Sequence, residues 1–273
     1  MDFNRRGAEA KQENKIYTMK KIVIAISILM MSISCGEIFA QKDGFSLHLS
    51  GVFPNGKFGE FGGLLLDYGP TIDGGAASIG FGLGVKYQRS ISSVKNLRAM
   101  FEADIMYNPL QEEIKDALDD LCFEWDGSIS SSVSTSKYLN IPLMAGLNYS
   151  FDLAEKIKLY GELGVGLNVR LITKNSIEKE CIYYYNGVEY SYTTKLGFEY
   201  NPAVSFACQV GVGVLLSEKL SVGLNYYNLG SAKVKGTYYE EDGVAAHGRY
   251  EESLNGYGSI SPSMLTLKVG YHF

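Results

Sequence analysis

The sequence has little of what several functional classes require. The formal net charge is −5, so the chain lacks the basic excess of nucleic-acid-binding proteins, and we expect no nucleic-acid partner. Outside the leader described below it has no apolar run long enough for a transmembrane helix. It contains six prolines, four cysteines, three histidines and one tryptophan. Glycine and tyrosine are abundant instead, with 31 and 20 residues, which is typical of strands between lipid and a polar lumen.

The first forty residues predict a secretory leader. A basic pair, Lys20 and Lys21, precedes the apolar run 22–31, and small residues follow up to Ala40, after which we expect cleavage. The alternative is a lipoprotein leader that is acylated at Cys35.

Residues 1–18 are polar and charged, which is unusual at the start of a signal peptide. We therefore expect Met19 to be the true start and 1–18 to be a non-native extension. The predicted organisation is a signal peptide over 19–40 and a mature chain over 41–273, which is long enough for one large β domain or two small ones.

In eight segments of the mature chain apolar and polar residues alternate with a period of two, the pattern of a strand with one apolar and one polar face. The last segment ends the chain with Tyr271 and Phe273 on its apolar side. An ordinary amphipathic edge strand is the alternative for this segment alone, but a terminal aromatic residue is typical of the closing strand of an outer-membrane barrel. We expect strands over 44–53, 79–87, 97–107, 138–151, 157–171, 204–214, 220–226 and 265–273.

The connections between these segments alternate strictly between short and long. Outer-membrane barrels have this alternation because their periplasmic turns are tight and their outer loops are long. The short connections are 90–96, 152–156 and 216–219, and the long ones are 54–78, 108–136, 172–202 and 229–262.

The predicted fold is therefore all-β: an eight-stranded antiparallel up-and-down transmembrane β-barrel with long outer loops and short periplasmic turns. We expect it in the outer membrane of a Gram-negative cell, with both termini in the periplasm. The expected partners are outer-membrane lipid and, during insertion, the barrel assembly machinery, for which Tyr271 and Phe273 would form the C-terminal assembly signal.

Three segments carry a resemblance to a known family. Residues 137–143 read Lys-Tyr-Leu-Asn-Ile-Pro-Leu, residues 160–166 form a glycine-rich strand, and the chain ends in an aromatic strand. Together they resemble the PorT-like, OmpA/OmpX-like outer membrane protein β-barrel domain family of the Bacteroidetes, over the whole mature chain. The resemblance implies the barrel fold, the outer membrane and a link to protein secretion or the cell envelope. It implies no catalytic residues.

Pro142 lies inside one of the predicted strands, although proline cannot donate a hydrogen bond to the strand ladder. We keep the strand and expect a bulge or a local gap in the ladder at this position.

Several charged residues face the lumen by the same alternation. Side chains fill the interior of an eight-stranded barrel, and buried charges must be paired, so we expect an internal salt-bridge network that acts as a structural plug. A narrow pore or proton path is the alternative. The predicted network contains Lys86, Arg98, Glu102, Asp104, Lys158, Glu162, Arg170 and Lys268.

Two further lumen features have a structural interpretation. Gly80, Gly82 and Gly84 alternate along one strand, so they are small lumen residues and not a phosphate loop, which needs a strand-turn-helix context. His48 and His272 share the inner face of the two closing strands, and we expect hydrogen-bonded lumen residues there.

No motif in the sequence predicts catalysis or metal binding. A lipid-modifying barrel would need a nucleophile and a base near the outer leaflet, and the strands place no histidine outward for that role. The acidic clusters lack EF-hand spacing. We therefore expect no enzyme activity, no catalytic residues, no metal site and no cofactor.

The long connections hold the candidate recognition surface. Tyrosine offers a large amphipathic contact area at low entropic cost, although an aromatic belt or self-packed loops are the alternative. Residues 110–121 have apolar residues at helical spacing, which predicts a short amphipathic helix. This helix would lie over the barrel mouth or, as the alternative, dock a partner. Cys122 and Cys181 are a possible disulfide pair. The candidate surface consists of Tyr183, Tyr184, Tyr185, Tyr190, Tyr192, Tyr238 and Tyr239.

These observations favour a structural or accessory outer-membrane barrel whose outer segments bind an envelope or secretion partner. A small pore or transport protein is the first alternative, and a lipid-modifying enzyme is the second.

Overall fold

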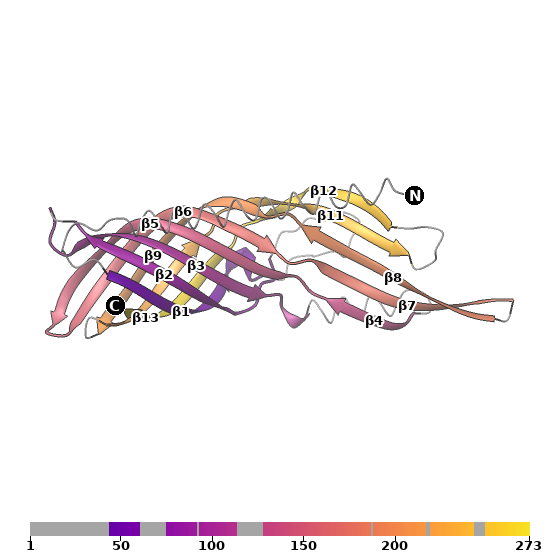
Figure 1. The fold of residues 1–273 in the computed structure, drawn as a ribbon, viewed down its shortest axis with the longest axis horizontal. Helices are drawn as coiled ribbons and strands as arrows, with labels where there is room; N and C mark the ends of the chain where they lie inside the picture. The colour runs from indigo at the N-terminus through magenta and orange to yellow at the C-terminus, as the bar shows by residue number, and fades with distance from the viewer. Residues whose placement is uncertain are drawn as a thin grey trace. The chain divides into compact units, whose positions relative to one another are not determined.

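Eight strands form the barrel in this computed structural model (Figure 1). The structure describes residues 44–60, 75–91, 93–113, 128–186, 188–216, 219–242 and 249–273, so the predicted leader lies outside the described residues. The barrel strands are β1 (Gly44–Asn55), β2 (Gly80–Ser90), β3 (Leu97–Pro109), β5 (Lys137–Ala154), β6 (Ile157–Ile172), β9 (Ala203–Leu216), β10 (Leu220–Asn228) and β13 (Ser263–His272).

Each barrel strand pairs antiparallel with its neighbours in chain order, and β1 closes the sheet against β13. The closing register runs from Ser46 opposite His272 to Asn55 opposite Ser263. The predicted eight-stranded antiparallel barrel is therefore confirmed.

The period-two pattern places the apolar side chains of the barrel on the outside. Leu49, Phe81, Leu163 and Phe206 come from four different strands and are each more than 60% exposed. Continuous exposed apolar surface of this extent is unusual on a protein in water, whereas it matches the lipid-facing band of a membrane barrel. Strands of 9 to 18 residues satisfy the length that a tilted membrane-crossing strand needs.

No helix in the described part of the chain is long and apolar enough to cross a membrane.

Pro142 stays within β5, and the strand ladder is interrupted beside it. On the β3 side, pairing stops after Ala103–Leu143 and resumes at Met106–Asn140 without a change of register. On the β6 side, Pro142 lies opposite Asn168. The expected local gap is thus present, because the missing N–H removes the hydrogen bond on one side only.

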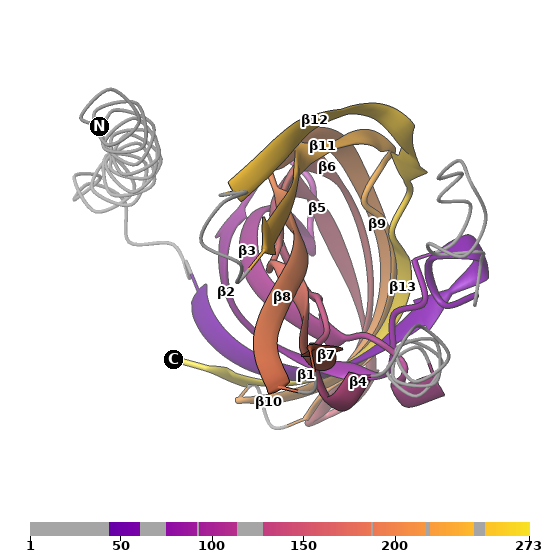
Figure 2. The ribbon, with the colours of Figure 1, turned by 90° about the vertical axis from the view of Figure 1, so that its right-hand side faces the viewer.

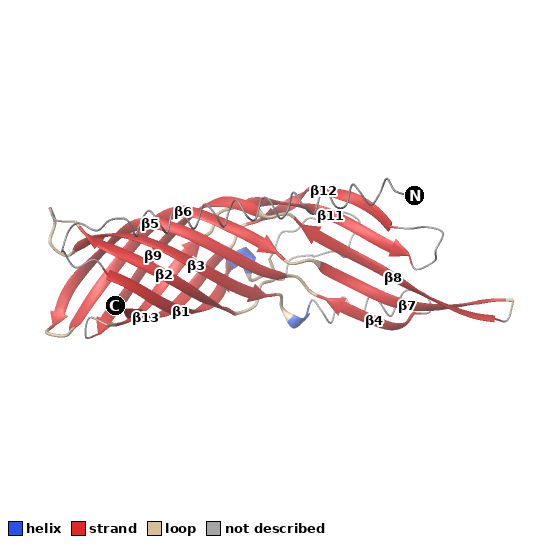
Figure 3. Cartoon of the chain, viewed as in Figure 1, coloured by secondary structure: helices blue, strands red, loops and turns tan. Residues whose placement is uncertain are grey.

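Beyond the barrel rim, the chain forms a second sheet, hereafter the outer sheet (Figures 1 and 3). Its order of strands, β12-β11-β8-β7-β4, follows the order of the barrel strands to which they connect, and Figure 2 shows them arranged in an arc. Its strands are β4 (Ser128–Ser134), β7 (Asn175–Tyr185), β8 (Val188–Tyr200), β11 (Ala232–Asp242) and β12 (Arg249–Ile260).

The outer sheet corrects the sequence-based prediction for three segments. We expected loops at 108–136, 172–202 and 229–262, but each contains strands that pair with strands of a neighbouring segment. The outer strands connect to neighbouring strands of the barrel, so they leave its rim side by side and can continue to pair. Tyrosine-rich runs also favour an extended backbone. Within these strands, only the backbone is described at 128–131, 181, 183–185, 242 and 254–257.

The mouth of the barrel below the outer sheet is filled by apolar side chains. A 3-10 turn, η1 (Gly56–Phe58), brings Phe58 edge-on to Tyr138, with 5.1 Å between ring centroids. The Tyr138 hydroxyl donates a 2.8 Å hydrogen bond to the carbonyl of Gly75. We call the buried group the mouth cluster: Val52, Phe58, Ala76, Ala77, Met106, Leu110, Tyr138, Met144, Ala207, Tyr227, Leu229, Val234, Ile260 and Met264.

Most of the helix expected over 110–121 lies outside the described residues, as does Cys122.

Candidate functional site

An ionic network occupies the middle of the barrel lumen. Lys86 of β2 lies between two carboxylates, with its Nζ atom 2.9 Å from Oε2 of Glu102 and 2.7 Å from Oε2 of Glu162. These acids come from β3 and β6, on different parts of the wall. Each of the three side chains is almost fully buried, so this lysine joins strands across the interior.

Lys268 of β13 forms the second branch of the network. Its ammonium donates to Glu102, to Oδ2 of Asp104 at 3.2 Å and to the hydroxyl of Tyr227 at 2.5 Å. The Tyr227 hydroxyl lies 2.7 Å from Oε1 of Glu102 and 2.9 Å from Oδ2 of Asp104, and donates its single hydrogen to one of them. All three donors of the ammonium are therefore used.

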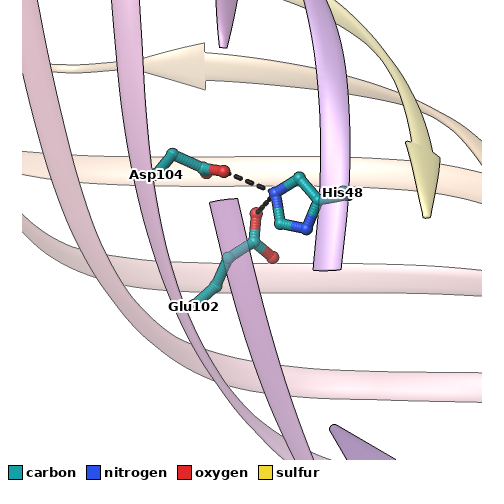
Figure 4. Close-up of side chains that lie close together, drawn as sticks. All are labelled: His48, Glu102 and Asp104. Atoms are coloured by element: carbon teal, nitrogen blue, oxygen red, sulfur yellow. Dashed lines mark hydrogen bonds and ion pairs between the residues drawn. The ribbon is translucent and has the colours of Figure 1, made fainter. Parts of the chain in front are cut away.

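His48 completes this branch (Figure 4). Its Nε2 atom lies 2.5 Å from Oδ1 of Asp104 and 3.8 Å from Oε1 of Glu102. Gly84 makes this contact possible, because a Cβ atom there would overlap both Asp104 and His48. The glycine on the inner face of β2 thus provides space for the network.

Two asparagines bind the remaining acid. The side-chain amide of Asn225 donates to Oε1 of Glu162, and that of Asn148 donates to Oε2 at 3.3 Å. Asn225 and Tyr227 were not among the predicted network residues. The alternation of β10 gives the signal that could have identified them, because it places both side chains inward.

The structure brings together five of the eight charged residues predicted for the lumen network: Lys86, Glu102, Asp104, Glu162 and Lys268. They carry three negative and two positive formal charges. Buried charges that are paired in this way are expensive to separate, since removing one leaves its partner uncompensated.

The other three predicted lumen residues lie outside this network. Lys158 is half-buried beside Asp152 at the β5–β6 turn, with 3.9 Å between charged atoms. Arg98 donates a 3.4 Å hydrogen bond to Gln88. Arg170 is 2% exposed and donates to two backbone carbonyls, at 2.7 Å to Ile260 and at 3.0 Å to Ala232.

The position of Arg170 gives it a different role from the predicted one. It belongs to β6 of the barrel, and its acceptors belong to β12 and β11 of the outer sheet. No carboxylate among the described residues pairs with it. It therefore fastens the outer sheet to the barrel by hydrogen bonds.

Three side chains in the network could in principle hold a metal ion. His48, Glu102 and Asp104 offer donor atoms that all lie within 4.8 Å of one another. Both carboxylates are already bound by the Lys268 ammonium, and Glu102 is also bound by Lys86. A cation would have to displace a lysine, so the arrangement supports a structural role.

The lumen is closed in layers along β1. Its inward residues are, in order, Ser46 and His48 at a cavity, Ser50, and then Val52 in the mouth cluster. The cavity, near the C-terminus, has a volume of about 30 Å³, room for roughly two water molecules. His272 lines it and lies 2.9 Å from the Ser221 hydroxyl.

The C-terminal aromatic residues lie at the seam where the barrel closes. The Phe273 amide donates a 2.9 Å hydrogen bond to the carbonyl of Phe45, and the two rings are 6.0 Å apart. Tyr271 packs on Phe273 with 5.1 Å between centroids, and both side chains are exposed. Their role as an assembly signal stays a prediction.

The candidate recognition tyrosines differ in how far their side chains are exposed on the outer sheet. Tyr190 is 43% exposed, while Tyr192 and Tyr238 are half-buried. The side chains of Tyr183, Tyr184 and Tyr185 lie outside the described residues, and so does that of Cys181 with its predicted disulfide. Among the described residues, Cys208 is free and exposed on the outer wall.

Tyr239 does not contribute to an exposed surface, contrary to the prediction. It is 2% exposed, because Arg249 of β12 covers its ring at 4.3 Å and Gly197 of β8 leaves room beneath it. The Arg249 guanidinium is held 2.7 Å from Glu241 and 2.9 Å from Glu251. This arrangement encloses a cation on one face of the sheet.

Tyr238 faces the other side of the sheet, among carboxylates. Its hydroxyl donates a 3.4 Å hydrogen bond to Glu240, and its ring packs on Phe198 with 5.3 Å between centroids. Partial burial, and then the negative charge of Glu240, raise the pKa of Tyr238.

No protein-family model and no curated protein matches the chain. Solved structures similar to it include Ail, the attachment invasion locus protein of Yersinia pestis, with 14% identity over 85% of this chain and 97% of that chain, and a TM-score of 0.36. A major outer membrane protein from Thermus thermophilus has 13% identity over 85% and 100%, with 0.42, and the outer membrane protein OprG from Pseudomonas aeruginosa has 10% over 85% and 95%, with 0.39. These values describe a loose likeness, so the architecture rests on this chain's own strand pairing.

Proposed function

We propose that this chain is an integral outer-membrane β-barrel with a plugged lumen, and that its outer sheet binds a partner in the cell envelope or in a secretion system. The observation that carries the proposal is the outer sheet itself. Strands β7 and β8 contain 11 and 13 residues beyond the barrel strands, a rise of roughly 35–45 Å at the usual spacing. Such an extension exceeds what closing the barrel requires.

The side chains of the outer sheet support a binding role. Tyr190 and Tyr250 are large and exposed, at 43% and 58%; Glu189 precedes Tyr190, and Glu240 pairs with Tyr250. Aromatic side chains are enriched in protein interfaces because they supply contact area with few rotatable bonds. The resemblance to the PorT-like family favours an envelope or secretion partner over a soluble ligand.

The lumen supports a plug better than a pore. An eight-stranded barrel has an interior that side chains can fill, and here the ionic network and the mouth cluster occupy it. In a planar bilayer, we expect the purified barrel to give no conductance steps under conditions in which a general porin does. Discrete steps from the folded protein would favour the small-pore alternative.

The partner is tested by photo-crosslinking in intact cells. A photoreactive amino acid replaces Tyr250 in the outer sheet or, as the matched control, Phe206 in the apolar band. We expect one stoichiometric protein adduct from position 250 and none from position 206, where lipid is the expected neighbour. Absence of a protein adduct at position 250, with surface expression and barrel folding intact, would contradict the binding proposal.

A further inference from the structure

The strand register divides the outer sheet into two faces. In antiparallel sheets, directly paired residues project to the same side. Ile177 pairs with Leu196, which pairs with Glu240, which in turn pairs with Tyr250. Ile177 packs against the mouth cluster, so this row belongs to the face turned toward the mouth, which we call the inner face. The neighbouring residues along each strand form the outer face.

On the outer face, four residues of β11 and β12 form a filled site, which we call the outer quartet: Tyr239, Glu241, Arg249 and Glu251. Tyr239 pairs with Glu251, and Glu241 pairs with Arg249. The guanidinium lies over the tyrosine ring and contacts both carboxylates, with Glu199 3.8 Å away as a third acid. Stacking on an aromatic face and charge-assisted hydrogen bonds are the two interactions that a guanidinium forms best.

On the inner face, the same two strands repeat the arrangement with one change. Tyr238 pairs with Glu252, and Glu240 pairs with Tyr250. We call these four residues the inner quartet. A tyrosine, Tyr250, stands where the outer quartet has its arginine, so the inner quartet has two aromatic rings, two carboxylates and no cation of its own. Among the described residues, neither Glu240 nor Glu252 forms an ion pair.

The inner quartet is preorganised and accessible. Phe198 supports the ring of Tyr238 from the next strand, and Tyr250 is 58% exposed. Glu252 is exposed as well. The register sets Tyr238 opposite Glu252 and Glu240 opposite Tyr250, so the four residues are neighbours on one face of β11 and β12. Packed aromatic rings beside two carboxylates that form no ion pair reduce the entropic cost of holding a ligand.

We propose that the inner quartet binds the guanidinium group of an arginine on an extended segment of the partner protein. This inference rests on the proposed function and names the chemistry of its partner. The cation would stack between Tyr238 and Tyr250 and receive the carboxylates of Glu240 and Glu252, as Arg249 does on the opposite face.

Charge complementarity supports a basic segment as the occupant. The five strands of the outer sheet contain nine acidic residues and five basic ones, a formal balance of −4. Lys233 and Lys235 lie at the start of β11, near the barrel rim, so the distal part is more acidic still. A positively charged segment would be attracted over a longer range than the contact itself.

The test uses the full barrel in detergent or nanodiscs and two fluorescent peptides. One is an extended serine-arginine peptide, and the other carries citrulline, a neutral group of the same shape, at each arginine. We expect the arginine peptide to bind at least about tenfold more tightly, because each lost charge-assisted hydrogen bond accounts for a factor of that order. Equal affinity of the two peptides would overturn the proposal.

Matched variants separate the inner quartet from the general acidic field. The double variant Glu240→Gln with Glu252→Gln removes the two inner carboxylates, and Glu178→Gln with Glu180→Gln removes the same charge from the outer face of β7. We expect about a tenfold loss of affinity from the first pair and less than about twofold from the second. Equal losses would mean attraction by the field alone. Heat-dependent gel mobility checks that each variant is folded, and Tyr250→Ala, which leaves the charge unchanged, is expected to weaken binding as well.

The outcomes also distinguish this inference from the proposed function. An adduct at position 250 in cells, together with equal binding of the arginine and citrulline peptides, would leave the partner-binding role standing and reject the guanidinium site. Absence of the adduct would instead reject the partner-binding role.

Discussion

Strands of the barrel and of the outer sheet alternate along the same chain, but the two sheets place their charges in opposite ways. The eight barrel strands carry seven basic and four acidic residues, a balance of +3, whereas the five outer strands carry five basic and nine acidic residues, a balance of −4. In the barrel the central charges are buried and paired inside. In the outer sheet, most of the described charged side chains are exposed, and several form ion pairs at the surface, as Arg249 does with Glu241 and Glu251.

The contrast concerns the stability that each set of charges contributes. A buried charge that loses its partner is costly, so substitutions in the lumen network should destabilise the barrel. Exposed ion pairs contribute little because water screens them. Substitution of exposed charges in the outer sheet should therefore cost little stability, whereas substitution of Glu102 or Lys268 in the barrel should cost much more. Four substitutions test this contrast between buried and exposed charges.

Removing the central carboxylate of the lumen should give the largest effect. Glu102→Ala leaves Lys86 and Lys268 without a shared acid, and we expect a loss of about 3–5 kcal/mol in the free energy of unfolding. Urea unfolding followed by tryptophan fluorescence or gel mobility measures it. The control, Glu241→Ala in the outer quartet, should cost less than about 1 kcal/mol. A similar loss of unfolding free energy in both variants would contradict the difference between buried and exposed charges.

Filling the space at Gly84 should disturb the network without removing a charge. A Cβ atom there overlaps Asp104 and His48, so Gly84→Ala should cost about 1–3 kcal/mol by overpacking. The same urea series measures it. Gly161→Ala on β6 is the matched control, since its Cβ would meet only the Gly211 carbonyl, at 3.9 Å. The overpacking account fails if the two alanine variants unfold at the same urea concentration.

Replacing Arg170 should separate the two regions. Arg170→Leu removes the hydrogen bonds to Ile260 and Ala232 while leaving the lumen network intact. We expect faster hydrogen exchange in β11 and β12, by about tenfold or more, with unchanged exchange in β1 and β2. Uniform acceleration in every strand would show that Arg170 stabilises the barrel as a whole.

Arg249→Ala should give the smallest effect. It uncovers the ring of Tyr239 and releases Glu241 and Glu251, which are exposed groups, so about 1 kcal/mol of local stability is expected to be lost. Hydrogen exchange of β12 at low and high salt measures it. The difference between wild type and variant should shrink at high salt, because the ion pairs are screened. A difference that does not depend on salt would assign the effect to stacking alone.

All eight barrel strands could be predicted from the sequence, because period-two alternation needs only the residue order along each strand. The assignment of Pro142 to a strand with a local gap was also correct. Its missing N–H interrupts the pairing with one neighbouring strand and leaves the pairing with the other intact. The strands of the outer sheet were missed, because both of their faces are mixed and no apolar face alternates. One signal was present: Asn186 and Gly187 stand between two tyrosine-rich runs, and Asn-Gly is a strong hairpin signature. Asn186 has a φ of 53°, as such a turn requires.

Residue order alone predicts which side chains face the lumen, since alternation on a strand assigns every residue to one face. Which of these side chains touch one another depends on the three-dimensional fold. Lys158, Glu162 and Arg170 share the inner face of β6, but they are separated by about 13 Å and about 26 Å along the strand. The stagger of the barrel places Glu162 beside Lys86, and leaves Lys158 at one end and Arg170 at the other. Height along the barrel axis depends on the register of every strand pair around the wall, and alternation within one strand carries no information about it.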